Sequence, residues 1–155
     1  MAEETGARLH VFHLSTARET TLFHNDVPLS EKHITSDVCI HLLWFCNEDY
    51  AHKGTHIKWN PAVKSAADRE GLWEALNDDR IDIIATDHAP HLLTEKNQNY
   101  LLSPSGGPLV QHGLLALLTC YTKGKITLEK IVEKTCHNPA ILFEIKERGY
   151  LRENY

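Results

Sequence analysis

Short β-rich runs alternate along this chain with segments of helical character, and this alternation restricts the fold more than any other feature. Strands are expected at residues 8–14, 33–41 and 80–86, with a further extended piece at 55–59. Helices are expected at residues 15–24, 65–79, 109–122, 127–134 and 138–144. Strands that are separated by helices need crossover connections, which produce a parallel sheet. The sequence therefore predicts an α/β fold.

The composition narrows the class of protein. A chain of 155 residues has room for one ordinary domain. The formal charge of −5 argues against a nucleic-acid partner, because phosphate binding needs a basic face. No apolar run approaches the ~20 residues of a membrane span, and the acidic first residues do not resemble a secretory signal. The four cysteines form no CxxC pair, so we expect reduced thiols and a cytoplasmic location.

Metal-capable side chains stand at the carboxyl ends of two of the expected strands. Leu9, Val11 and His13 alternate along the first strand, and Ala85 and Asp87 do so at the end of the third. In parallel α/β folds the carboxyl ends of the strands carry the functional site. If each apolar stripe faces the same side, an imidazole and a carboxylate meet above the sheet. A core histidine and a loop carboxylate are the plainer alternatives, and both stay open at this point.

The segment that continues the third strand carries the strongest chemical signal. Asp87 is followed by histidines one and four residues later, His88 and His91, in a chain that contains 11 histidines. A carboxylate at the end of a buried strand is costly without a partner for its charge. A metal ion would supply that partner, and histidine is the commonest protein ligand for one.

With these residues the sequence resembles a known family, the bacterial type I dihydroorotases of the amidohydrolase superfamily. The most specific match is IATDHAPH at residues 84–91. Further matching pieces, in the family's order, lie at residues 9–16, 57–61, 67–70 and 138–140. The resemblance therefore extends along nearly the whole chain.

The resemblance implies a fold and an activity. It implies that residues 1–155 form a partial domain, about strands six to eight with their helices, of a TIM (β/α)8 barrel. It implies a zinc-dependent hydrolase of cyclic amides, with one or two zinc ions. The reaction would interconvert N-carbamoyl-L-aspartate and L-dihydroorotate in pyrimidine biosynthesis. The implied partner is this small-molecule substrate, and we also expect a homo-oligomer.

The resemblance also implies roles for individual residues. His13 falls on the family's sixth-strand zinc histidine. Asp87 falls on the eighth-strand aspartate, which binds zinc and moves the proton, so it is the expected catalytic residue. Four further residues fall on substrate-contacting positions: Asn60, His91, Ser105 and Gly106.

The chain departs from the family pattern in two respects. The first-strand His-x-His with its arginine, the bridging carboxylate and the fifth-strand histidine have no counterpart, and such a barrel takes ~250 residues. We therefore expect a carboxyl-terminal fragment of a longer enzyme, inactive by itself. The family also has two histidines in the stretch where this chain reads Cys39-Ile40-His41-Leu42. We interpret His41 as a structural residue.

Two alternative functions stay open. Allantoinases and hydantoinases share similar motifs, although the histidine after Asp87-His-Ala-Pro and the Asn60-Pro61 pair favour dihydroorotase. A non-catalytic homologue, kept as a scaffold, belongs to a different class. Retention of His13, Asn60, Asp87 and His91 argues against it, because a scaffold has no need of these residues.

Overall fold

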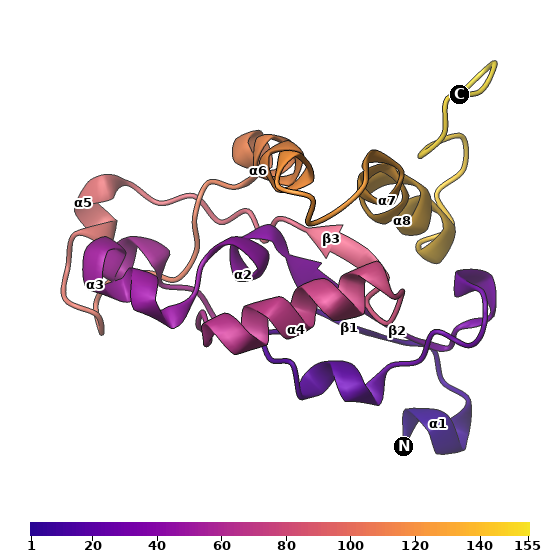
Figure 1. Cartoon of the computed structure of the whole chain (residues 1–155), viewed down its shortest axis with the longest axis horizontal. Helices are drawn as coiled ribbons and strands as arrows, with labels where there is room; N and C mark the ends of the chain where they lie inside the picture. Colours follow the sequence, from indigo (N-terminus) through magenta and orange to yellow (C-terminus); the bar gives the residue numbers. More distant parts are fainter.

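A parallel three-stranded sheet organises the chain, and the computed structural model describes all residues from 1 to 155. The strands are β1 (Leu9–Val11), β2 (Ile34–Cys39) and β3 (Ile83–Ala85), in the order β1-β2-β3. Figure 1 shows the strands side by side, with helices packed around them. The predicted α/β class and the parallel sheet are confirmed.

Most of the helices are short. The α-helices are α1 (Ala2–Thr5), α2 (Ile40–Trp44), α3 (Tyr50–Lys53), α4 (Ala66–Asn77), α5 (Leu93–Lys96), α6 (Val110–Thr122), α7 (Leu128–Val132) and α8 (Asn138–Leu142). The 3₁₀ helices are η1 (Glu19–Leu22), η2 (Leu29–Glu31), η3 (Asn47–Asp49) and η4 (Gly54–Ile57), and η5 (Glu133–His137) is a π-helix. None of these helices is both long and apolar enough to cross a bilayer.

Helix α4 forms where the sequence predicts it. Ser65 caps it: its hydroxyl accepts the N–H of Asp68 at 3.1 Å, and the Asp68 carboxylate accepts the N–H of Ser65 at 3.3 Å. The apolar face of the helix is buried and consists of Leu72, Trp73, Ala75 and Leu76. This face joins the hydrophobic core, so α4 fixes how the connection from β2 to β3 covers the sheet.

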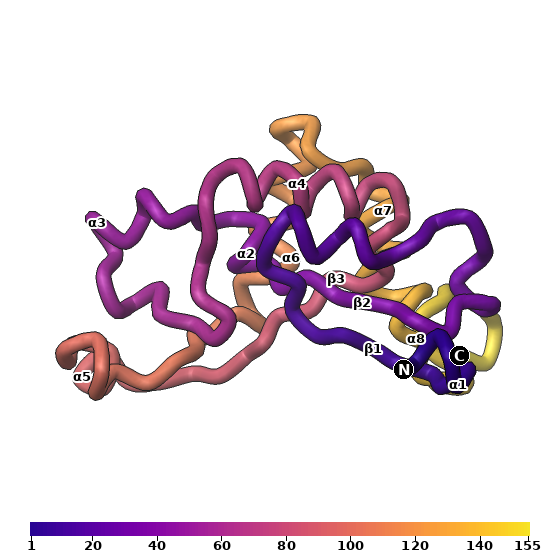
Figure 2. The backbone as a smooth tube through the Cα atoms, turned by 90° about the horizontal axis from the view of Figure 1, so that it is seen from below, coloured from indigo at the N-terminus to yellow at the C-terminus, as the bar shows by residue number.

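The two faces of the sheet differ in character. On one face Val38 and Ile84 belong to the hydrophobic core, together with residues of α4 and α6. On the other face His10 and Asp37 lie 3.1 Å apart, Nε2 to Oδ2. Figure 2 shows α4 along one side of the strands. Because the strand order is β1-β2-β3, β1 and β3 are the edges of the sheet.

The register of the strands corrects one expectation from the sequence. Val11 pairs with Ser36, whereas Asp37 pairs with Ile83. Because successive residues of a strand point to opposite faces, Val11 and Ile83 lie on opposite faces of the sheet. The expectation that the two apolar stripes share one face is therefore wrong.

Several element boundaries also differ from expectation. The second strand ends at Cys39, and the chain turns directly into α2, so His41 is helical. Residues 55–59 were expected to be extended, but most of them belong to the 3₁₀ helix η4. The polar segment 88–108 contains α5, and Figure 1 shows α3 and α5 together at the end of the molecule toward which the strands run.

Candidate metal centre and substrate loop

Three side chains able to bind a metal meet at the carboxyl ends of β2 and β3. They are Cys39, the last residue of β2; His41, in the first turn of α2; and Asp87, two residues after β3. One ligand atom from each lies within 4.8 Å of the other two. Cys39 and His41 are buried, whereas Asp87 is exposed. The sequence predicted Asp87 at this place, whereas it did not bring Cys39 there and was interpreted as giving His41 a structural role.

The side chain of His41 is buried, at 1% exposure, and has no hydrogen-bond partner. Its ring stacks on Trp59, with centroids 4.3 Å apart and planes at 9°, and neither of its nitrogens is paired. A buried polar group left unpaired costs about 1–3 kcal/mol. Burial, together with the nearby charge of His13, lowers the pKa of His41 to about 3. The ring is therefore neutral at pH 7, which is the form that binds metals.

The Cys39 thiol is also in an unusual environment. Burial, and then the negative charges of Asp37 and Asp87, raise the pKa of this thiol well above its usual range. Without a cation the side chain stays protonated beside two carboxylates. A divalent metal reverses this balance, because a coordinated thiol loses its proton.

These three residues fit a zinc ion. A thiolate, an imidazole and a carboxylate are all zinc ligands, and three protein ligands is the usual number in catalytic zinc sites. The orphaned nitrogens of His41 are the observation that a metal explains best. The residues that would hold the ion are thus Cys39, His41 and Asp87, with His13 close to His41.

His13 lies just beyond β1, in a backbone turn that Asp37 holds. Its φ is +45°, and Asp87 shows a similar φ of +48° after β3. Non-glycine residues in this left-handed region cost about 1–3 kcal/mol and often occur at functional sites. Asp37 Oδ1 accepts the N–H of His13 at 2.6 Å, and its backbone carbonyl accepts that of Leu14 at 2.9 Å. Because of this turn, strand alternation does not set the direction of His13.

The predicted substrate residues lie on the segments that follow β3 and η4. His91 Nε2 lies 3.0 Å from the carbonyl oxygen of Ser105, so these two residues are brought together. Gly106 has a φ of +124°, and a Cβ there would lie 2.6 Å from Ala89. Asn60 is exposed. Only a residue without a side chain fits where Gly106 passes Ala89, which explains the glycine.

A buried lysine fastens this segment. Lys96, which is 5% exposed, donates from Nζ to the carbonyls of Pro104 and Gly106, both at 2.9 Å, and to that of Lys58 at 3.2 Å. Gly106 N–H in turn donates to the Lys58 carbonyl at 2.9 Å. The segment with Ser105 and Gly106 is thus tied to the chain just before Asn60.

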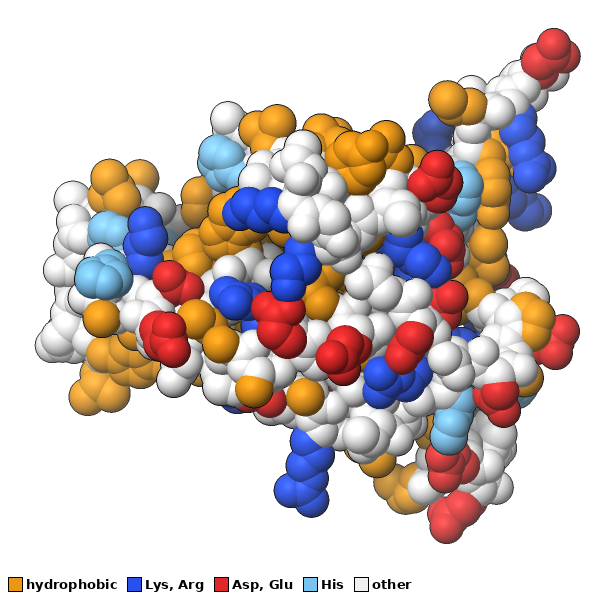
Figure 3. All heavy atoms as spheres, in the orientation of Figure 1, with side chains coloured by type: hydrophobic (Ala, Val, Ile, Leu, Met, Phe, Trp, Pro, Cys, Tyr) orange, Lys and Arg blue, Asp and Glu red, His pale blue; other side chains and the backbone are white.

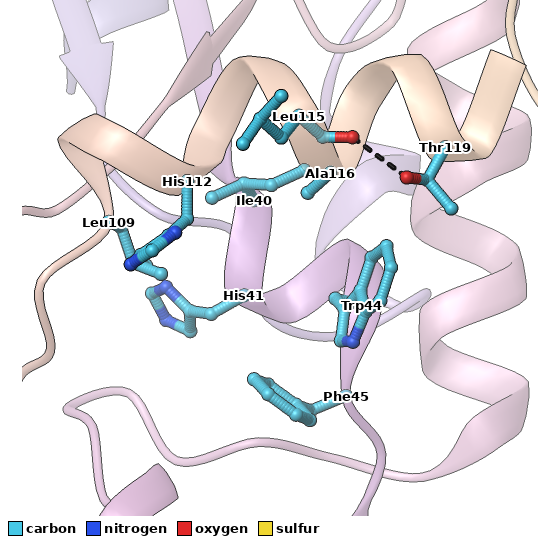
Figure 4. A pocket seen from close by; sticks show the side chains of 9 residues that line it. All are labelled: Ile40, His41, Trp44, Phe45, Leu109, His112, Leu115, Ala116 and Thr119. Carbon is cyan, nitrogen blue, oxygen red and sulfur yellow. Dashed lines mark hydrogen bonds between the residues drawn. The ribbon is translucent and has the colours of Figure 1, made fainter.

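An apolar pocket of about 360 Å³ lies between α2 and α6. Figure 4 shows His41 and His112 among its otherwise mainly apolar lining, with Thr119 bonded to the Leu115 carbonyl at 2.8 Å. None of the four predicted substrate residues lines it. The pocket adjoins the metal-capable cluster through His41 but is separate from the loop that carries Ser105 and Gly106.

No family model matches the chain. Comparison with curated proteins, however, finds relatives that are named dihydroorotase. The chain is 38% identical over 155 residues to a protein named dihydroorotase from Lactococcus lactis, covering 99% of this chain and 36% of that protein. A dihydroorotase from Carboxydothermus hydrogenoformans is also 38% identical, over 157 residues that cover all of this chain and 36% of that protein. The chain thus spans about a third of the length of these curated relatives.

Solved structures give the same result for the fold. The L-hydantoinase (dihydropyrimidinase) from Arthrobacter aurescens superposes with a TM-score of 0.85 at 28% identity, over 97% of this chain and 34% of that one. A Saccharomyces cerevisiae dihydroorotase, solved in complex with 5-fluoroorotic acid, superposes with a TM-score of 0.80 at 16% identity, over 90% of this chain and 39% of that one. The fold is therefore that of a segment of an amidohydrolase TIM barrel. The whole chain is homologous to a segment that makes up about a third of the length of the proteins named dihydroorotase.

Proposed function

We propose that this chain contributes the metal- and substrate-binding strand ends of a zinc-dependent cyclic amidohydrolase, a dihydroorotase. The reaction interconverts N-carbamoyl-L-aspartate and L-dihydroorotate, a step of pyrimidine biosynthesis. One observation carries the proposal: Asp87 stands at the carboxyl end of β3 beside Cys39 and His41, in a chain 38% identical to proteins named dihydroorotase.

Asp87 has the central chemical role in this proposal. A bound zinc ion supplies Lewis acidity that polarises the amide carbonyl and acidifies water. The Asp87 carboxylate accepts the proton of the attacking water and delivers it to the ring nitrogen that leaves. Its exposed side chain is open to substrate, as a proton-transferring group must be. His13, whose charge acts on His41, would serve as a further zinc ligand.

The loop after β3 binds the substrate. A carbonyl oxygen only accepts, so His91 Nε2 carries the hydrogen in its contact with Ser105. This contact and the hydrogen bonds from Lys96 hold the backbone of Ser105 and Gly106 in one place. The exposed carboxamide of Asn60 offers both a donor and an acceptor to the ring of the substrate.

The likeness to an L-hydantoinase supports a second candidate. That structure has the highest TM-score among those described above, and hydantoins are also cyclic amides. The difference between the two functions lies in the substrate loop, because dihydroorotate carries a carboxylate that simple hydantoins lack. The cytoplasm is the proposed location, in line with four free cysteines.

Kinetics of the protein made from the complete gene that encodes this chain test the proposal. The zinc-loaded protein is assayed with dihydroorotate, N-carbamoyl-aspartate, hydantoin and allantoin. We expect turnover of the first two compounds to exceed that of the others. Faster turnover of hydantoin supports the second candidate. A folded, zinc-loaded protein that opens none of these rings overturns both proposed activities and supports the alternative of a non-catalytic scaffold.

A further inference from the structure

We propose that Trp59 is a positioning residue for the substrate loop, residues 88–108, because its ring sets the place of Gly107. Trp59 directly precedes Asn60 in the chain, and Gly107 directly follows Gly106. This inference deepens the proposed function, on which the role of the loop in substrate binding rests. The family resemblance assigned no role to Trp59 or to Gly107.

The indole ring of Trp59 is fixed by the core of the molecule. Its side chain is 3% exposed and belongs to the hydrophobic core. The ring stacks on His41, with centroids 4.3 Å apart and planes at 9°, and on Phe45, with centroids 6.1 Å apart and planes at 26°. His41 belongs to α2 and Phe45 directly follows this helix. The ring therefore offers the loop a surface that the core holds in place.

Gly107 passes so close to this ring that no side chain fits between them. A Cβ at Gly107 would lie 2.6 Å from Cζ2 of Trp59 and 3.4 Å from Cε2 and Cη2. Unlike Gly106, Gly107 does not have a positive φ, so its backbone conformation is open to alanine. The ring of Trp59, and not the backbone, is what requires a glycine here.

Gly107 is also the point where the two ends of the loop meet. Its carbonyl accepts the N–H of Ala89 at 3.2 Å, and it forms a parallel bridge with His88. His88 directly follows Asp87. A ring that fixes Gly107 therefore fixes both the substrate-contacting backbone at Gly106 and the residues that follow Asp87.

The indole N–H shows that the shape of the ring matters at this place. Nε1 of Trp59 is buried and has no hydrogen-bond partner, whereas a buried tryptophan usually finds one. Trp59→Phe therefore gives up no hydrogen bond. It keeps an aromatic ring to stack on His41 but lacks the Cζ2 atom that faces Gly107. This substitution opens space where an alanine at position 107 would need it.

Steady-state kinetics of the protein made from the complete gene test the role with a pair of substitutions. Gly107→Ala drives a methyl group against the ring and displaces the loop. We expect KM for dihydroorotate to rise about 10–100-fold, with a much smaller change in kcat. Adding Trp59→Phe should lower KM again, although it is a second substitution, because it removes the clash. A wild-type KM in Gly107→Ala, or a defect that Trp59→Phe does not relieve, overturns the proposal.

Gly113→Ala is the matched control. Gly113 is a buried glycine of α6, and a Cβ there would lie 3.4 Å from Cγ2 of Thr86, which is an ordinary contact. We expect this variant to have the KM of the wild type. Urea denaturation verifies that each variant is folded. If Gly107→Ala is too unstable to assay, the double variant with Trp59→Phe should be folded and active, and failure to recover overturns the proposal as well.

Hydrogen exchange separates this inference from the proposed function, because it needs no activity. Exchange at residues 88–91 and 105–108 should be faster in Gly107→Ala and should return toward the wild-type rate in the double variant. This pattern in a protein that opens no cyclic amide overturns the proposed function and leaves Trp59 as the support of the loop. Turnover of dihydroorotate, with KM and exchange unchanged in Gly107→Ala, does the reverse.

Discussion

Asp37 holds His13 in its left-handed turn, since its Oδ1 accepts the His13 N–H at 2.6 Å. Its second oxygen lies 3.1 Å from Nε2 of His10, whose Nδ1 lies 2.9 Å from the Thr35 hydroxyl. One buried carboxylate on β2 therefore fixes the end of β1. The position of a proposed metal ligand depends on a charge in the neighbouring strand.

Replacing this carboxylate should loosen the strand end. Asp37→Asn keeps the volume of the side chain but has one oxygen where the carboxylate has two. The His13 N–H and His10 Nε2 each contact one of those two oxygens in the wild type, so one of these contacts is lost. We expect a loss of about 1–3 kcal/mol in the free energy of unfolding and weaker zinc binding, measured by urea denaturation and zinc titration. Asp26→Asn, at an exposed position, is the control. Equal stability of both variants would contradict this role.

The sequence predicted one part of the candidate site and not the other. Asp87 was predicted because an apolar strand leads directly into it and two histidines, His88 and His91, follow it. Cys39 and His41 were missed because residues 40–44 are largely apolar, and a short apolar run does not distinguish strand from helix. The strand was extended through His41, and the turn at Cys39 that brings both side chains to Asp87 was not foreseen.

Long elements were predicted better than short ones for a related reason. Helix α4 has a capping residue and a regular apolar face, and both signals are local. The direction of His13 depends instead on its φ of +45° and on a hydrogen bond to Asp37, 24 residues away. No periodicity within residues 8–14 encodes that contact, so alternation alone does not set the direction of His13.

The Lys96 anchor should control the substrate loop. Lys96→Met keeps an apolar stem but removes the ammonium donor from three carbonyls, of which that of Lys58 keeps the Gly106 N–H. We expect faster hydrogen exchange at residues 97–107, measured by mass spectrometry, and a larger rise in KM than fall in kcat in the protein from the complete gene. Lys53→Met, at an exposed lysine, should leave both unchanged. Unaltered exchange in Lys96→Met would show that the loop does not depend on this anchor.

Asp79 should give the chain an acid-sensitive contribution to stability. Burial alone would raise the pKa of Asp79, but hydrogen bonds from Lys130 at 2.6 Å and from Lys134 at 2.7 Å lower it. A lowered folded-state pKa stabilises the fold above the unfolded value of about 3.9, and this contribution is lost as pH falls through the folded-state value.

The difference in the free energy of unfolding between wild type and Asp79→Asn should therefore become smaller as the pH falls from about 7 to about 3. Urea denaturation across this range measures this difference. Glu129→Gln, which removes an exposed carboxylate, serves as the control. A difference that stays constant with pH would exclude Asp79 as the source of the acid sensitivity.

Helix α6 presents apolar side chains to solvent and should promote association. Figure 3 shows hydrophobic side chains gathered over this helix. The exposed members are Val110, Leu114, Leu115, Leu118 and Tyr121. Such a patch on a single chain marks an interaction surface. We expect the 155-residue chain to elute above its 17.6 kDa mass in light-scattering chromatography.

The double variant Leu114→Gln, Leu118→Gln should shift the chain toward monomer. Leu22→Gln and Leu151→Gln, which change exposed leucines elsewhere, should not. If all variants associate equally, the open edges of β1 and β3 are the sites of association instead, because unpaired strand edges recruit other strands.

Catalysis should require Asp87 and more of the barrel than this chain provides. Three strands cannot close a barrel of eight, so we expect no dihydroorotase turnover from the 155 residues alone. In the protein from the complete gene, Asp87→Asn should lower kcat about 10²–10⁴-fold in both directions. An amide cannot accept the proton of water, and it is a poorer metal ligand than a carboxylate. Because Asp87 is exposed, the variant should unfold like the wild type. Wild-type turnover in Asp87→Asn, for ring opening and ring closing alike, would refute the proton-transfer role.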